Sequence, residues 1–156
     1  MANPADPDDI RAWQRLSEAV TSSGCLTAAD PARLAGIGVR HVINLALDDH
    51  PEALPDEGER LAALGIGYSH IPVPFDAPAA MHFDAFVSAL DGAEHPVHVH
   101  CIMNWRVSAF LYRLHRLQGM DATEADALLQ VQWDPRHSDD PRAVVWAAFI
   151  AGGNSR

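Results

Sequence analysis

The feature that most constrains this chain is the alternation of short β-rich runs with helical segments. The apolar runs, which read as buried strands, lie at residues 41–47, 67–73 and 96–100. Helical spacing of apolar residues, or helix start and stop signals, marks residues 30–35, 57–64, 83–90, 107–117, 121–131 and 141–150. Strands that alternate with helices predict an α/β fold, in which a mainly parallel central sheet is flanked by helices.

The length of 156 residues suits a single domain that spans residues 1–156. Its polar, proline-containing start, residues 1–9, is expected to be a flexible lead-in. This acidic start resembles neither a signal peptide nor a transit peptide, and no apolar stretch in the chain is long enough to span a bilayer. We therefore expect a cytoplasmic protein that does not use a membrane as a partner.

The charge balance limits the partners further. The formal net charge is −10, and all 11 basic residues are arginines. Such an acidic surface argues against nucleic acid as a partner and requires any anion site to be local. The two cysteines, Cys25 and Cys101, make no disulfide framework and are expected to be free thiols in a reducing cytosol.

Residues 97–108 carry the chemistry, because they are predicted to run from a strand through a tight loop into a helix. Cys101 follows the strand directly, and Arg106 opens the helix. Unpaired N–H groups and the dipole at a helix N-terminus attract an anion, and a guanidinium can grip two of its oxygens. The same field favours a thiolate, which suits in-line attack on phosphorus. Main-chain and side-chain groups expected to surround the bound phosphate belong to Ile102, Met103, Asn104, Trp105 and Arg106.

A metal site is an alternative use of this segment, because His98 and His100 stand beside Cys101. On a strand the two histidines share a face while Cys101 turns away, and zinc sites usually have more closely paired ligands. We therefore expect no metal.

Three segments resemble cysteine-based protein tyrosine and dual-specificity phosphatases. His100-Cys101, four residues, Arg106 and then Ser108 resemble their signature loop. Residues 36–45 are similar to their Gly-x-x-x-Val-Ile-Asn-Leu segment, and residues 64–73 resemble the strand that leads into their general-acid loop. The resemblance covers residues 23–117 and implies a dual-specificity phosphatase type of fold.

The loop departs from the usual pattern in three ways. Four residues instead of five separate Cys101 from Arg106, Asn104 replaces the central glycine, and Val107 replaces the Ser or Thr that follows the arginine. The four-residue gap is similar to that of the bacterial β-lactamase-hydrolase-like phosphatases, which are the best match within the superfamily.

The resemblance implies a role for each matching residue. Cys101 would be the nucleophile and form a cysteinyl-phosphate, and Arg106 would hold the phosphoryl oxygens. Asp76, the carboxylate between Val73 and Phe83, would protonate the leaving oxygen, and Asp84 and Asp134 are the alternative donors. Ser108 would hydrogen-bond the departing thiolate, and His100 would fix the loop through a ring N–H. The substrate would be a phosphorylated protein or small molecule, and no cofactor is implied.

Two other functions remain open from the sequence. Rhodanese-type sulfurtransferases also have a four-residue gap and carry a persulfide on the cysteine, which would make Cys101 a sulfur carrier. The loss of the loop glycine is compatible with a phosphate-binding module that has no catalytic activity. The sequence leaves the oligomeric state and the role of Cys25 open.

Overall fold

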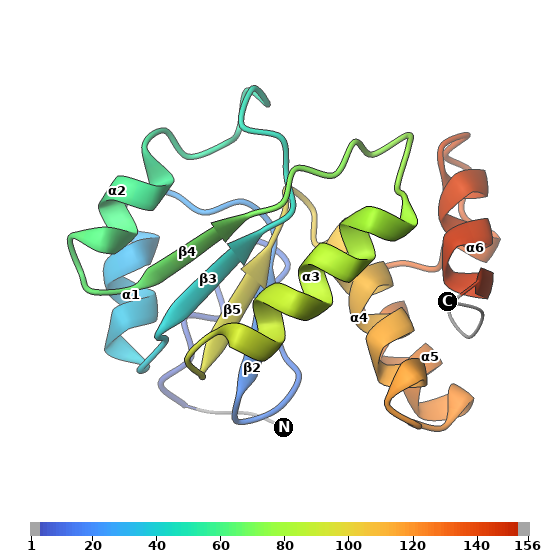
Figure 1. Cartoon of the computed structure of the whole chain (residues 1–156), viewed down its shortest axis with the longest axis horizontal. Coiled ribbons are helices and arrows are strands. Elements are labelled where there is room, and N and C mark those ends of the chain that lie inside the picture. Colours follow the sequence, from blue (N-terminus) through green and yellow to red (C-terminus); the bar gives the residue numbers. More distant parts are fainter. Residues whose placement is uncertain (1–3, 153–156) are drawn as a thin grey trace.

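A single five-stranded sheet forms the centre of the computed structural model, which describes residues 4–152 (Figure 1). Its order is β1-β2-β5-β3-β4. Within the described residues, β1 pairs antiparallel with β2, and the other neighbouring strands are parallel. The strands are β1 (Gln14–Arg15), β2 (Val20–Ser23), β3 (His41–Asn44), β4 (Gly67–His70) and β5 (Val97–His100). The expected mainly parallel sheet is confirmed.

Three of these strands, β3, β4 and β5, were predicted from the sequence, but β3 and β4 end about three residues early. β4 stops at His70, two residues before Pro72, because proline has no N–H to donate to a neighbouring strand. The sequence did not indicate β1 or β2. β2 reads Val-Thr-Ser-Ser and is nevertheless mostly buried, so packing against β5 rather than its own apolar pattern defines it.

Helices cover both faces of the sheet, with α1 and α2 on one side and the later helices on the other (Figure 1). Every predicted helix is present, with ends shifted by a few residues, and one 3-10 helix (η1) was not predicted. The elements are α1 (Asp30–Gly36), α2 (Glu57–Ala62), α3 (Ala80–Gly92), α4 (Trp105–Leu117), α5 (Ala122–Gln130), η1 (Pro135–His137) and α6 (Ala143–Ala151).

Two hydrophobic clusters fill the spaces between the sheet and its helices. Successive strand residues point to opposite faces, so Val42 joins the cluster under α1 and α2, whereas Ile43 joins the larger cluster under α3, α4 and α6. Both side chains are fully buried. The larger cluster fixes α4, and therefore the position of its N-terminus, against the end of β5.

The start of the chain is held to the sheet from Asp6 onward. Asp6 and Arg15 form an ion pair at 2.5 Å, and both side chains are largely buried. Of the lead-in expected to be flexible, residues 1–3 lie outside the described residues, whereas residues 4–9 pack on the domain through this pair and through Asp9 on Arg33.

Candidate active site

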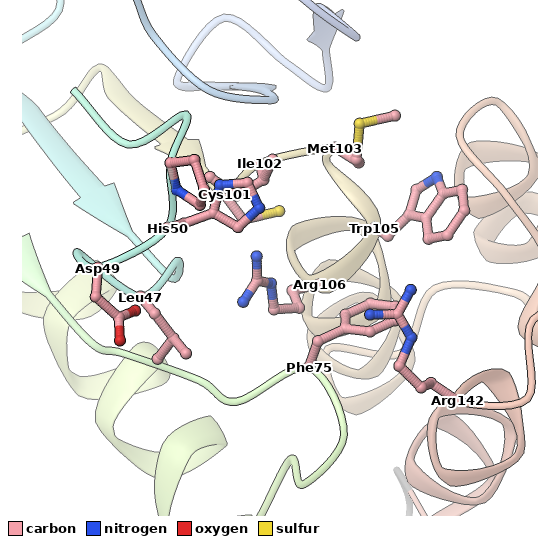
Figure 2. A pocket seen from close by; sticks show the side chains of 11 residues that line it. Leu47, Asp49, His50, Phe75, Cys101, Ile102, Met103, Trp105, Arg106 and Arg142 are labelled. Atoms are coloured by element: carbon pink, nitrogen blue, oxygen red, sulfur yellow. The ribbon is translucent and has the colours of Figure 1, made fainter.

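A cavity of about 410 Å³ opens where the parallel strands end and α4 begins. Ligand sites of open α/β sheets lie at this edge. The Cys101 sulfur and the Arg106 guanidinium face the same space (Figure 2). The other lining residues come from the loops after β3, β4 and β5, from the first residue of α4 and from the residue before α6; they are Leu47, Asp49, His50, Pro51, Phe75, Ile102, Met103, Trp105 and Arg142.

Asn104 makes the short loop between β5 and α4 possible. It has φ 67° and ψ 5°, the left-handed conformation that favours glycine and that asparagine tolerates better than most residues. Its buried side-chain NH₂ group donates to the carbonyl of Ala12 at 2.9 Å and to Ser22 Oγ at 3.0 Å. Asparagine at this position is therefore compatible with the left-handed turn of this four-residue loop.

Main-chain hydrogen bonds join the end of β2 and the residues after it to the loop between β5 and α4. The Cys25 amide donates to the Ile102 carbonyl at 3.0 Å, and the Cys101 amide donates to the Ser23 carbonyl at 3.4 Å. A Cβ at Gly24 would clash with the Ile102 carbonyl oxygen, so only glycine fits this approach. Burial raises the pKa of the half-buried Cys25 thiol, against the opposing effect of Arg11. Nothing in the sequence indicated that Cys25 adjoins the loop.

The two residues expected to carry out the reaction are both buried. Cys101 is 1% exposed at the bottom of the cavity, and Arg106 is 7% exposed. Arg106 Nη1 donates to the Val73 carbonyl at 2.9 Å, and its guanidinium lies over the Phe75 ring at 5.7 Å. These contacts fix the guanidinium without occupying it with a carboxylate, so donors remain for an anionic guest.

A buried histidine–glutamate pair adjoins Cys101. His100 Nε2 lies 2.5 Å from Glu57 Oε2, and the two side chains are 3% and 5% exposed. His100 Nδ1 lies 3.2 Å from the Cys101 carbonyl oxygen, so the ring connects Glu57 of α2 to the start of the loop. The sequence indicated the loop-fixing role of His100, but it gave no sign that Glu57, at the start of α2, would reach it.

Replacing Glu57 by Ala is expected to lower the free energy of unfolding by about 3 kcal/mol, because it leaves a buried imidazole without its acceptor. Glu57→Gln, which keeps an acceptor but no charge, should cost less. Urea unfolding measures both, with Glu59→Ala as the control, since Glu59 is an exposed acid on the same helix. A Glu57→Ala protein as stable as the control would show that the pair does not stabilise the fold.

His98 ties β2 to β5 beneath the loop. Its Nδ1 lies 2.8 Å from Thr21 Oγ1, and its Nε2 lies 2.8 Å from Ser23 Oγ. Ser23 Oγ donates its own proton to the Gly24 carbonyl, so it accepts from His98 Nε2–H. Burial, together with the neighbouring His100, holds the pKa of His98 well below its usual value. His98 is therefore neutral and structural.

Aromatic side chains form one wall of the cavity. Trp105 stacks on Trp133 with ring centroids 4.7 Å apart, and Phe75 contacts both of these rings. Trp146 of α6 donates its indole N–H to the Phe75 carbonyl at 2.6 Å. This contact anchors the loop after β4 on the C-terminal helix.

Three of the residues proposed from sequence lie away from the cavity. Ser108 donates to the Trp105 carbonyl at 3.2 Å and faces a separate small pocket beside Leu111, because residues two apart on a helix point in different directions. Asp76 is exposed and is not among the lining residues. The Asn104 side chain points back toward β2. Cys101, Ile102, Met103, Trp105 and Arg106 all line the cavity, as expected.

The sequence did not identify the lining residues Leu47, Asp49, His50, Pro51 and Arg142. Leu47 ends a predicted strand and residues 49–51 follow it, a position where site residues are common in this kind of fold, and this was the one signal available. Arg142 had no such signal, because only the packing of α6 on Phe75 brings it to the cavity.

Among residues 4–152, no group of three or more His, Cys, Asp or Glu side chains is arranged to hold a metal ion. None of the helices in the same range is both long enough and apolar enough to cross a membrane.

Comparison with solved structures defines the class of protein. A protein assigned as a phosphatase (DUF442) from Shewanella putrefaciens CN-32 is 28% identical, with a TM-score of 0.77 over 96% of this chain and 97% of that chain. TpbA from P. aeruginosa, solved with phosphotyrosine, is 21% identical, with a TM-score of 0.71 over 99% and 96%. The PP-IP phosphatase SIW14 from S. cerevisiae is 13% identical, with a TM-score of 0.73 over 91% and 85%. The fold is that of the cysteine-based protein tyrosine and dual-specificity phosphatases.

Residues 10–116 match the family model of the β-lactamase hydrolase-like protein, phosphatase-like domain, and the chain belongs to this family. Curated proteins give no match. The family and the fold together support a phosphatase, and therefore a hydrolase.

Proposed function

We propose that the protein hydrolyses a phosphate monoester through a cysteinyl-phosphate intermediate. One observation carries the proposal: the Cys101 sulfur and the Arg106 guanidinium face one cavity at the N-terminus of the 13-residue helix α4. The helix dipole and the free N–H groups of its first turn favour a dianion there.

The reaction has two steps. The Cys101 thiolate attacks phosphorus as the bond from phosphorus to the leaving oxygen breaks, and that oxygen takes a proton from an acid. Water then attacks phosphorus, which releases inorganic phosphate and restores the thiolate. Arg106 and the amides of residues 102–106 stabilise the charge that spreads over the phosphoryl oxygens in both steps.

The proton donor is a choice between two carboxylates. Asp76 is the donor that the family resemblance suggests, but it does not line the cavity; both Asp76 and Asp49 are exposed. Asp49, from the loop after β3, is the carboxylate that lines the cavity. The present geometry favours Asp49, and Asp76 would need the loop after β4 to move inward.

The alternatives are less well supported. The non-catalytic module was motivated by the missing glycine, yet Asn104 has the left-handed conformation that the turn requires. The sulfurtransferase was motivated by the four-residue gap alone, and the matched family is one of phosphatase-like domains.

A pair of assays tests the proposal on the purified protein. Hydrolysis of an aryl phosphate such as 4-nitrophenyl phosphate is expected, because TpbA is solved with phosphotyrosine and aromatic rings line this cavity. Transfer of sulfur from thiosulfate to cyanide is not expected. Sulfur transfer without phosphate release would favour the sulfurtransferase, and tight vanadate binding without any turnover would favour the module.

A further inference from the structure

A second guanidinium lines the cavity, and the proposed reaction does not use it. Arg142 lies just before α6, outside the residues that match the family model. In a chain with a net charge of −10, two of the eleven arginines line one cavity of about 410 Å³. Because the reaction needs only Arg106, Arg142 requires another explanation.

Arg142 is held in one orientation. Its Nε and Nη2 donate to the carboxylate of Asp140 at 3.1 and 2.8 Å, and its own amide donates to the same carboxylate at 2.9 Å. Its guanidinium lies over the Phe75 ring at 4.5 Å, and Trp146 anchors Phe75 through the main chain. A guanidinium fixed in this way loses little side-chain entropy when it binds a ligand.

The remaining donor of Arg142 is available to a guest. Nη1 has no hydrogen-bond partner among residues 4–152. The hydrogen bond that Arg142 donates to Asp140 is the main reason that the pKa of Arg142 is raised, and Asp76 adds a smaller attraction, so the group is always charged. Neither carboxylate is among the residues that line the cavity, whereas Arg142 is. A ligand in the cavity therefore contacts the Arg142 guanidinium and not the carboxylate of Asp140.

The two arginines contact the same aromatic ring. Both guanidiniums lie over Phe75, at 5.7 Å for Arg106 and 4.5 Å for Arg142, so they are at most about 10 Å apart. A phosphoryl group held by Arg106 places its leaving group along the wall formed by Phe75 and Trp105 (Figure 2). The far end of a leaving group as long as a substituted benzene ring then lies near Arg142.

We propose that Arg142 determines substrate specificity by binding a second anionic group on the phosphomonoester, about one ring length from the ester. This inference rests on the proposed function. The second group is a carboxylate or a phosphate, since both accept hydrogen bonds from a guanidinium.

Matched substrates test the inference. The esters 3-(4-phosphonooxyphenyl)propanoate and 4-propylphenyl phosphate have leaving groups of similar size, and only the first leaving group carries a carboxylate. The wild-type kcat/KM is expected to be about threefold to tenfold higher for the ester with the carboxylate, a modest ratio because Arg142 is half exposed. Arg142→Gln should bring the ratio to about one, and Arg142→Glu should invert it. A bisphosphate of hydroquinone, compared with 4-methoxyphenyl phosphate, shows whether phosphate is preferred to carboxylate.

Arg40→Gln is the control, because Arg40 is an exposed arginine paired with Glu94 and does not line the cavity. Its substrate ratio should equal that of the wild type. Equal wild-type rates on both esters, or a ratio that survives Arg142→Gln, would overturn the inference and leave the proposed function intact. A wild-type protein that hydrolyses none of the esters would instead overturn the proposed function, and the inference with it.

Discussion

Replacing Cys101 by Ser is expected to lower kcat for an aryl phosphate by at least about a thousandfold, as removal of a covalent nucleophile usually does. The serine hydroxyl occupies the same place but stays protonated, because the field at the α4 N-terminus cannot ionise an alcohol. The measurement is steady-state release of inorganic phosphate. Isothermal titration calorimetry of orthovanadate binding to the variant shows whether the anion site survives the change.

Cys25→Ser is the matched control, because Cys25 adjoins the loop through its amide but does not line the cavity. It should retain activity close to that of the wild type. If Cys101→Ser kept substantial activity, or if Cys25→Ser lost as much, the nucleophile would have been assigned to the wrong residue.

Replacing Arg106 by Lys is expected to lower kcat/KM by about a hundredfold or more, although the charge is kept. An ammonium cannot present two parallel N–H groups to the phosphoryl oxygens, and it cannot at the same time donate to the Val73 carbonyl as Arg106 does. Steady-state kinetics on the aryl phosphate measures the loss.

The control for this variant is Arg116→Lys on the same helix. Arg116 also donates from Nη1 to a main-chain carbonyl, that of Met120 at 2.7 Å, but it lies outside the cavity. The Lys variant at this position should lose only stability. An Arg106→Lys protein that was no less active than Arg116→Lys would show that a bidentate grip is not needed.

Much of the fold was predictable because its signals are local. The apolar run at residues 41–44 and the helical spacing at residues 83–90 each indicate a buried element without knowledge of its neighbours. β2 could not be found in this way. Its serines are buried because His98 and Asn104 hydrogen-bond them, and those partners lie more than 70 residues away along the chain.

The same distinction between local signals and long-range contacts applies to the residues of the site. Cys101 and Arg106 were predictable, because the loop and helix that hold them are continuous in sequence. Ser108 was proposed from the resemblance, as the hydroxyl one place after Val107, but the helix turns its side chain away from the cavity. Glu57 and Arg142 could not be predicted, because only packing between distant elements brings them to the loop and to Phe75.

Trapping the reaction midway tests the central claim most directly. Wild-type protein mixed with an aryl phosphate, quenched with a strong denaturant within the first turnovers and digested with trypsin, should yield the peptide of residues 61–106 with one phosphoryl group on Cys101, as read by mass spectrometry. The same peptide from Cys101→Ser should carry none. A wild-type peptide that remained unmodified during turnover, or that carried an extra sulfur atom instead, would contradict phosphate hydrolysis through the cysteine.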